Sequence, residues 1–301
     1  MPDATPSPDA TPSPLDPKAD LGAFLRSRRA RVRPETTGLP SYGRRRVPGL
    51  RREELAQLAG VSVAYYTRFE QGRAENVSAQ IVDAVAAALD LDEDESDYLN
   101  RLVEAAGRRR PPIAAEPAQQ VRPGLRRLLD SIPDTPAFVV GRRTDVLAWN
   151  ALAATLLTDF DDLPPKHRNK AWLVFRHAEV RSRFANWEVK ARDIVAYLRM
   201  DAARHPGDPA LAALVAELSE HSADFRELWD EHEVRDKTHG GYHLRHPEVG
   251  EFTLAYESLT LPGDPDQTLI TYTAEAGSPS EAALRLLTHS RTPAHPEDAV
   301  R

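Results

Sequence analysis

Apolar residues recur at helical spacing through the first third of the chain, from Leu21 to about Ala106. Gly60 and Gly72 interrupt this pattern, and Ser62 is a favourable N-cap for the helix between them. The pattern therefore predicts five short helices that form one compact all-α domain. Its core positions include Leu21, Phe24, Leu25, Leu55, Leu58, Ala59, Tyr66, Phe69, Ile81, Val82, Val85, Leu89, Tyr98, Leu99, Leu102 and Val103.

Beyond residue 123 the pattern changes to a mixture of strand and helix signals. Two short apolar runs separated by Gly141–Thr144 predict a hairpin, and a long helical middle follows. Alternating apolar and polar residues then predict three antiparallel strands and a last helix. This order indicates an α+β domain in which helices cover a sheet. The predicted strands are Ala137–Val140, Asp145–Trp149, Tyr242–Arg245, Glu251–Leu261 and Thr268–Thr273, and the predicted helices include Trp187–Met200, Ala210–Leu218, Phe225–His232 and Ser280–Leu287.

Some segments lack apolar periodicity. Residues 2–13 contain the unit Pro-Asp-Ala-Thr-Pro-Ser twice in tandem, which cannot bury enough surface to fold. Residues 108–123 are rich in Arg and Pro, as is typical of a linker. The expected organisation is a disordered tail at 1–19, a helical domain at 20–107, a linker at 108–123, an α+β domain at 124–290 and a disordered tail at 291–301.

The chain has 301 residues, no cysteine and a formal net charge of −7. The lack of cysteine excludes disulfides, thiolate nucleophiles and cysteine-ligated metal sites. The segment 18–76 carries 13 Lys and Arg against six Asp and Glu, so it is +7 and the rest of the chain is −14. A basic head on an acidic body is typical of a nucleic-acid-binding module joined to another domain. Because no stretch suits a membrane helix or a signal peptide, we expect a cytoplasmic protein with no membrane partner.

The stretch Arg51–Gly72 has the spacing of a DNA-binding helix-turn-helix. Small Ala56 lets two helices approach, Gly60 takes the turn, and Val61 fills the space beneath it. Arg68 is the best candidate for a bidentate contact to guanine; the opposing interpretation is a helical hairpin with a solvated basic face. Base contacts are expected from Val63, Ala64, Thr67 and Arg68, phosphate contacts from Arg52, Ser62 and Tyr65, and phosphate or minor-groove contacts from Arg44, Arg45 and Arg46, while Arg51 and Arg73 complete the predicted DNA-binding set.

Further motifs accompany this stretch, namely Gly38–Pro40, Arg44–Glu54, Tyr65–Arg73, Asp145–Asn150, Arg168–Asn169, His246–Pro247, Val249–Gly250 and Gly277–Pro279. Together they resemble the MmyB-like branch of bacterial regulators with an XRE (lambda-repressor-like) helix-turn-helix. The long loop between the first two helices departs from the shorter XRE pattern but is similar to that branch. The resemblance implies a PAS-like C-terminal sensor domain, which in some members binds fatty acid-like ligands, and an ion pair between Arg29 and Glu70.

Aromatic residues are frequent in the second half of the chain. Each one taken singly is expected to be a core residue, but together they could line an apolar pocket with a few polar groups. Asn150 has a second interpretation as the N-cap of the helix that follows it. The candidate ligand-binding residues are Trp149, Asn150, Phe175, Arg176, Trp187, Tyr197, Trp229, His232, Tyr256 and Tyr272.

Four histidines crowd the region before Pro247, namely His232, His239, His243 and His246. His239 and His243 have the spacing of a helical metal pair, but two glycines separate them, so we expect a polar loop rim and no metal. The chain carries no Gly-rich phosphate loop, no Gly-x-Ser-x-Gly elbow, no HExxH and no GxGxxG motif. We therefore expect no enzyme activity and no cofactor.

These patterns indicate a sequence-specific regulator that binds double-stranded DNA as a homodimer and senses a small apolar, fatty acid-like molecule. One alternative makes the acidic body a dimerisation or protein-interaction module without a ligand. A second alternative gives that body hydrolytic activity. A bound organic molecule in the purified protein would distinguish ligand sensing from the first alternative. Turnover that is lost on replacing one His or acidic residue would support the second alternative, hydrolytic activity.

Overall fold

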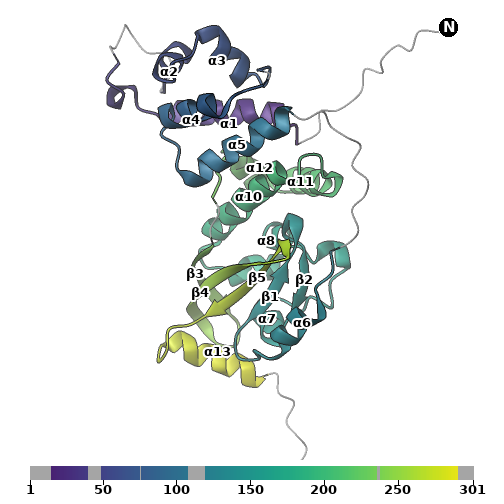
Figure 1. Ribbon diagram of the computed structural model, residues 1–301. Coiled ribbons are helices and arrows are strands. Elements are labelled where there is room, and N and C mark those ends of the chain that lie inside the picture. The colour runs from purple at the N-terminus through teal and green to yellow at the C-terminus, as the bar shows by residue number, and fades with distance from the viewer. Residues whose placement is uncertain (1–14, 40–48, 75, 108–118, 236–237, 291–301) are drawn as a thin grey trace, which may run out of the picture. The chain divides into compact units, whose positions relative to one another are not determined.

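In the computed structural model of the chain, the described residues are 15–39, 49–74, 76–107, 119–235 and 238–290. They divide into two compact units (Figure 1). Unit 1 consists of Met1–Ala114, Arg199–Glu217 and Trp229–Arg235, and unit 2 consists of Ala115–Leu198, Leu218–Leu228 and Asp236–Arg301. Within the described ranges, no helix is long and apolar enough to cross a membrane.

Unit 1 begins with the helices that the apolar pattern predicts. The side chain of Asp16 caps the first of them by accepting a hydrogen bond from the backbone N of Lys18 at 3.1 Å. Pro17 occupies the first helical turn, where its missing N–H is not needed. The helix therefore begins at Pro17, before residue 20 where the helical domain was expected to start. These helices are α1 (Pro17–Arg31), α2 (Arg52–Leu58), α3 (Val63–Glu70), α4 (Ala79–Ala88) and α5 (Glu93–Gly107).

The core of unit 1 is apolar and closely packed. Phe24 of α1 and Tyr98 of α5 are buried and meet edge to face, with 5.1 Å between their ring centroids, a favoured geometry for aromatic rings. Met200, Ala203 and Val234, from the two later segments of this unit, belong to the same core. The core of unit 1 therefore includes residues far along the chain from its five N-terminal helices.

Unit 2 contains a five-stranded antiparallel sheet with the order β2-β1-β5-β4-β3. The predicted hairpin and the three later strands are all confirmed, and the later strands extend beyond their predicted ends. The strands are β1 (Ala137–Val140), β2 (Val146–Trp149), β3 (His239–His246), β4 (Gly250–Leu261) and β5 (Asp264–Thr273). The fold is thus an all-α helix-turn-helix domain together with an α+β domain.

Along the chain, helices precede, separate and follow the strands of this sheet. The middle of the chain is helical, as predicted, and the last helix follows β5. The helices are α6 (Pro123–Asp130), α7 (Ala151–Leu156), α8 (Lys170–Arg176), α9 (Ala178–Arg183), α10 (Trp187–Arg204), α11 (Pro209–His221), α12 (Ala223–Asp230) and α13 (Pro279–Ser290), and the short 3-10 helices are η1 (Pro34–Thr36), η2 (Arg142–Thr144) and η3 (Pro165–His167).

The sheet presents a different set of side chains on each face, because successive residues of a strand point in opposite directions. On one face, Leu125 and Leu129 of α6 pack against Val139 of β1 and Leu269 of β5. The other face carries four buried aromatic side chains from four different strands. We call them the aromatic row: Phe138, Tyr242, Tyr256 and Tyr272.

Candidate functional site

Helix α3 exposes one side and buries the other. Tyr66 and Phe69 are at most 1% exposed and pack into the core of unit 1. The backbone N of Tyr65 donates to Oγ of Ser62 at 3.1 Å, so Ser62 caps the helix as its sequence position predicts. The exposed side chains at the start and on the outer side of the helix are Ser62, Val63, Ala64 and Arg68. This is the surface that a recognition helix presents to a major groove.

The turn between α2 and α3 has the geometry that the sequence indicates. Gly60 has a φ of 66°, in the region that glycine adopts without steric cost. Val61 packs against the core, and its backbone N donates to the carbonyl O of Ala56 at 2.9 Å. Ala56 is fully buried, which lets the two helices approach closely. The turn of the helix-turn-helix is therefore built around these three positions.

Glu70, the last residue of α3, is fully buried and is held by two arginines. Its Oε2 accepts from Nε of Arg29 at 2.9 Å, and its Oε1 accepts from Nη2 of Arg52 at 2.7 Å. Burial alone would raise the pKa of Glu70, but the hydrogen bonds and charges of both arginines outweigh it, so the net pKa is lowered. The ion pair of Arg29 with Glu70 that the resemblance implies is present.

The remaining predicted DNA-binding residues fall into three groups. Arg52 is 43% exposed, and it donates two hydrogen bonds to Glu70 besides facing solvent. Tyr65 and Thr67 are partly buried on α3, and Arg51 is partly buried before α2, whereas Arg73 is exposed. The three loop arginines Arg44, Arg45 and Arg46 lie outside the described residues. The structure therefore brings most of the set together on or beside α2 and α3.

Two of the candidate ligand-binding residues, Tyr256 and Tyr272, stand opposite each other on neighbouring strands. Their ring centroids are 6.4 Å apart, and Tyr242 stacks on Tyr256 at 4.8 Å. Phe138 continues the aromatic row 6.0 Å from Tyr272. The two predicted tyrosines thus belong to one continuous aromatic surface inside unit 2, together with two residues that the candidate set did not contain.

Asn150 supports the hairpin and the helix that follows it. Its Oδ1 accepts from the backbone N of Ala137 at 3.1 Å and of Ala153 at 3.0 Å. Its Nδ2 donates to the carbonyl O of Ile132 at 2.9 Å and of Thr135 at 2.7 Å. The amide therefore uses both its acceptor and its donor group on backbone, which agrees with the N-cap interpretation.

The other predicted residues of unit 2 lie at separate places. Phe175 packs edge to face on Trp187, with 5.7 Å between centroids, and Trp187 donates its Nε1–H to the carbonyl O of Val174 at 2.9 Å. Trp149 packs on Phe160 at 5.0 Å. Phe160, Phe175 and Trp187 are buried, whereas Trp149 is partly buried. Arg176 is exposed and Tyr197 is partly buried.

Trp229 and His232 belong to unit 1. Trp229 is buried, and the guanidinium carbon of Arg199 lies 4.3 Å from its ring centroid. Burial lowers the pKa of His232 to about 4, with a further contribution from the positive charge of Arg199, so the ring is neutral at pH 7. These two residues therefore lie in a different unit from the aromatic row.

The expectation that the histidines form a polar loop rim is wrong for three of them. His239, His243 and His246 lie on β3, where residues four apart do not have helical spacing. His246 is buried, with Nε2 at 3.1 Å from the carbonyl O of Thr155, while the other two are exposed. In the described part of the chain, no group of three or more metal-ligating side chains could hold a metal ion.

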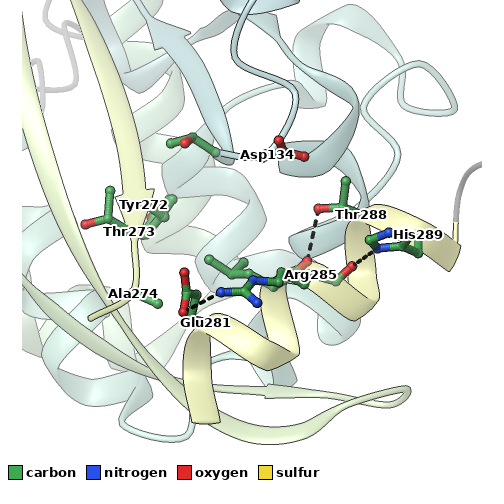
Figure 2. Close-up of a pocket in the computed structure, with 10 residues that line it drawn as sticks. Asp134, Tyr272, Thr273, Ala274, Glu281, Arg285, Thr288 and His289 are labelled. Carbon is green, nitrogen blue, oxygen red and sulfur yellow. Dashed lines mark hydrogen bonds and ion pairs between the residues drawn. The ribbon is translucent and has the colours of Figure 1, made fainter. Parts of the chain in front are cut away.

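Unit 2 also has an open pocket of about 460 Å³ beside α13. Figure 2 shows its polar rim, where Arg285 forms an ion pair with Glu281 at 2.7 Å. Tyr272 is the one candidate ligand-binding residue in its lining. The residues that line the pocket are Asp134, Thr135, Tyr272, Thr273, Ala274, Glu281, Leu284, Arg285, Thr288 and His289.

Lys170 and Lys190 were absent from the candidate set, although both approach the aromatic row. The Nζ atom of Lys190 lies 4.2 Å from the ring centroid of Tyr242, and that of Lys170 lies 5.7 Å from the centroid of Phe138. The helical period gives a signal for Lys190, because it stands four residues before buried Ile194 on the apolar side of α10. Lys170 follows the N-cap Asn169, and its sequence position gives no such signal.

The chain contains a helix-turn-helix whose second helix is capped and faces outward, and an α+β domain with a five-stranded antiparallel sheet. Together these features define a transcription regulator with a DNA-binding domain and a separate sensor-type domain. Comparison with known families agrees with this class. A family model described as helix-turn-helix domain matches residues 20–99. A second, described as MmyB-like transcription regulator ligand binding domain, matches residues 121–287.

The second match covers more than half of the chain, and the chain therefore belongs to the MmyB-like transcription regulators. This confirms the resemblance that the sequence motifs indicated. Both matched families are regulator domains and neither is an enzyme family. No curated protein matches the chain.

Proposed function

We propose that this regulator reads a specific double-stranded DNA sequence with α3, and that a small fatty acid-like molecule bound in its α+β domain changes its affinity for that sequence. The observation that carries the first part is the exposed side of α3, which presents Val63, Ala64 and Arg68. The guanidinium of Arg68 suits a bidentate contact to guanine, and the two small apolar side chains suit thymine methyl groups. Since DNA is the target, the proposed place of action is the cytoplasm.

The support for an apolar ligand comes from the aromatic row and from the family match. Ligand pockets are mostly apolar and carry a few polar groups that orient the ligand. Tyr256 and Tyr272 supply apolar ring faces, and they lie within the segment that matches the ligand binding domain. A ligand that binds one conformation of this domain more tightly than another would shift the population that binds DNA.

A homodimer is part of the proposal, because a single small reader domain buries too little surface for a tight specific complex. We place the dimer contact in the acidic C-terminal half, since the net charge of +7 between residues 18 and 76 opposes close approach of two heads without DNA. Sedimentation of the full chain tests the dimer, and a monomer at micromolar concentration without DNA would contradict it.

The experiment that tests the function is genome-wide binding, followed by footprinting of the strongest site with purified protein. We expect a protected region with two half-sites about one helical turn apart. Titrations of that site with and without sodium decanoate then measure whether the ligand changes the Kd. A Kd that no apolar ligand changes would favour a C-terminal domain that only dimerises, and the lack of any preferred site would contradict the proposal itself.

A further inference from the structure

The face of the sheet that lies opposite the aromatic row is covered over only part of its width. Helix α6 packs on β1 and β5 of this face through Leu125 and Leu129. On β3 and β4 the side chains of the same face are exposed, since residues that pair across antiparallel strands point to the same side. We call these side chains the open face, and its cross-strand pairs are His239 with Glu257, Gly241 with Ala255, His243 with Thr253 and Arg245 with Glu251.

The edges of this sheet are occupied where neighbouring segments run along them. Beside β3, the backbone N of Ala185 donates to the carbonyl O of His243 at 2.9 Å, and Phe184 forms a bridge with Leu244. Beside β2, the backbone N of Val146 donates to the carbonyl O of Arg168 at 2.7 Å. An additional strand cannot pair with these backbone groups, so a partner of the sheet would have to lie on its face.

The open face is flat at its centre and apolar at its border with α6. Gly241 and Ala255 stand opposite each other with side chains no larger than a methyl group, so a second layer can approach closely there. Leu259 is 50% exposed and pairs with Leu269, which packs under α6. Sheets that pack face to face lie about 10 Å apart and bury such side chains between them.

The charges of the open face are sorted by strand. Strand β3 carries Arg245 and two histidines, and β4 carries Glu251 and Glu257. Nη2 of Arg245 lies 2.7 Å from Oε1 of Glu251, and both side chains are more than half exposed. The hydrogen bond and the charge of Arg245 lower the pKa of Glu251, so this carboxylate is ionised at pH 7. A surface with both signs is not complementary to a partner of uniform charge, such as nucleic acid.

A second copy of the same face is complementary in one arrangement. A two-fold axis parallel to the strands, midway between β3 and β4, places β3 of each copy over β4 of the other at the same level along the strands. Arg245 then lies over Glu251 of the second copy, and His239 lies over Glu257 of the second copy. The small residues Gly241 and Ala255 also face each other across the axis.

The other in-plane two-fold axis, perpendicular to the strands, has the opposite electrostatic result. It places β3 over β3 of the second copy, with Arg245 over His239, and β4 over β4, with Glu251 over Glu257. Like charges that meet across an interface are unfavourable and suppress that arrangement. The charge pattern therefore selects the parallel axis.

We propose that the open face is the contact between two copies of this chain, with Arg245 of each copy paired to Glu251 of the other. The inference rests on the proposed homodimer and adds to it the surface, the symmetry axis and the charged residues that specify it. A symmetric contact contains each of these pairs twice, so one substitution changes two places in the dimer.

The test uses charge reversal in the full chain and measures dimerisation by sedimentation equilibrium without DNA. Arg245→Glu makes both charged positions of this pair acidic, and Glu251→Arg makes both basic. Each variant alone should raise the dissociation constant of the dimer by about tenfold to a hundredfold, because like charges then meet across the axis twice.

An equal mixture of the two single variants should dimerise again. In a mixed dimer the two acidic groups of one chain lie over the two basic groups of the other. Neither chain of the mixture has its own ion pair between positions 245 and 251, so recovery can only come from contacts between chains. The mixture therefore separates an interface from a merely structural role of the ion pair.

Arg285→Glu is the matched control, because Arg285 forms an exposed ion pair with Glu281 on α13, outside the open face. It should leave the dissociation constant unchanged. Ala255→Arg is an independent variant without effect on the ion pair, and it should also weaken the dimer because it places a long charged side chain at the flat centre. Circular dichroism shows which variants fold.

A wild-type dimer that persists in Ala255→Arg and in both charge reversals would overturn the inference and place the dimer contact elsewhere, while the proposed homodimer stands. Weakening in both charge reversals without recovery in their mixture would also overturn it. A wild-type chain that is monomeric at micromolar concentration would contradict the proposed homodimer itself, and the inference with it.

Discussion

The carboxylate of Glu70 lies 2.9 Å from Nε of Arg29, so the end of the recognition helix is joined to the first helix of unit 1 by a buried ion pair. Arg52, at the start of α2, completes the arrangement from the other side. Three helices of the head are thus connected through one fully buried side chain. This arrangement fixes the direction in which α3 presents Arg68.

We expect Glu70→Ala to destabilise the head by about 3–5 kcal/mol, because removing one member of a buried ion pair leaves its partner without compensation. The free energy of unfolding by urea measures the loss, and Glu53→Ala, an exposed acid on α2, is the control. A loss for Glu70→Ala no larger than that of the control would show that the ion pair does not contribute to stability.

The same carboxylate predicts acid sensitivity. The pKa of Glu70 is lower in the folded protein than its ordinary value of 4.5. A group with a depressed folded pKa contributes stability above its unfolded pKa and loses it as pH falls through the folded pKa. The unfolding midpoint of the wild-type protein should therefore decrease below about pH 4.5 more steeply than that of Glu70→Gln, and parallel curves would contradict this.

Arg68→Ala should remove site preference while weak, salt-sensitive binding remains. A bidentate contact to guanine contributes about 1–3 kcal/mol of discrimination, whereas the contacts to the DNA backbone are made elsewhere. The measurement is the ratio of the Kd values for the footprinted site and for a scrambled duplex, with Gln71→Ala as an exposed neighbouring control. An unchanged ratio would move the recognition surface away from Arg68.

Replacing Arg44, Arg45 and Arg46 together by alanine should weaken binding to specific and non-specific DNA alike. Each neutralised phosphate contributes about 0.9 to the slope of log affinity against log salt concentration, so the slope should fall by one to three such steps. Titrations at several salt concentrations measure it. If the slope stays the same, this loop does not contact the phosphates.

Asn150→Ala should destabilise unit 2 whether or not a ligand is present. The amide makes four hydrogen bonds to backbone groups, and each buried partner left unsatisfied costs about 1–3 kcal/mol. Thermal unfolding with and without decanoate measures this, with exposed Lys166→Ala as the control. A variant that keeps its stability but loses only ligand binding would instead place Asn150 in the ligand site.

The helix-turn-helix could be predicted from the sequence because its determinants are local. Helical periodicity, the N-cap Ser62 and the turn glycine Gly60 each act within a few residues, and the structure shows each in its expected role. The strands of unit 2 were also predictable, since alternation of apolar and polar residues marks the buried face of a sheet.

Tertiary structure decided which chemical groups meet. No local pattern brings Lys170 of α8, Lys190 of α10 and Tyr242 of β3 together, because their proximity depends on strand order and on how the helices pack on the sheet. The aromatic candidates were separated for the same reason, with Tyr256 and Tyr272 on the sheet of unit 2 and Trp229 in unit 1. Side-chain periodicity specifies which residues are buried, whereas long-range packing specifies their neighbours, and a binding site is defined by neighbours.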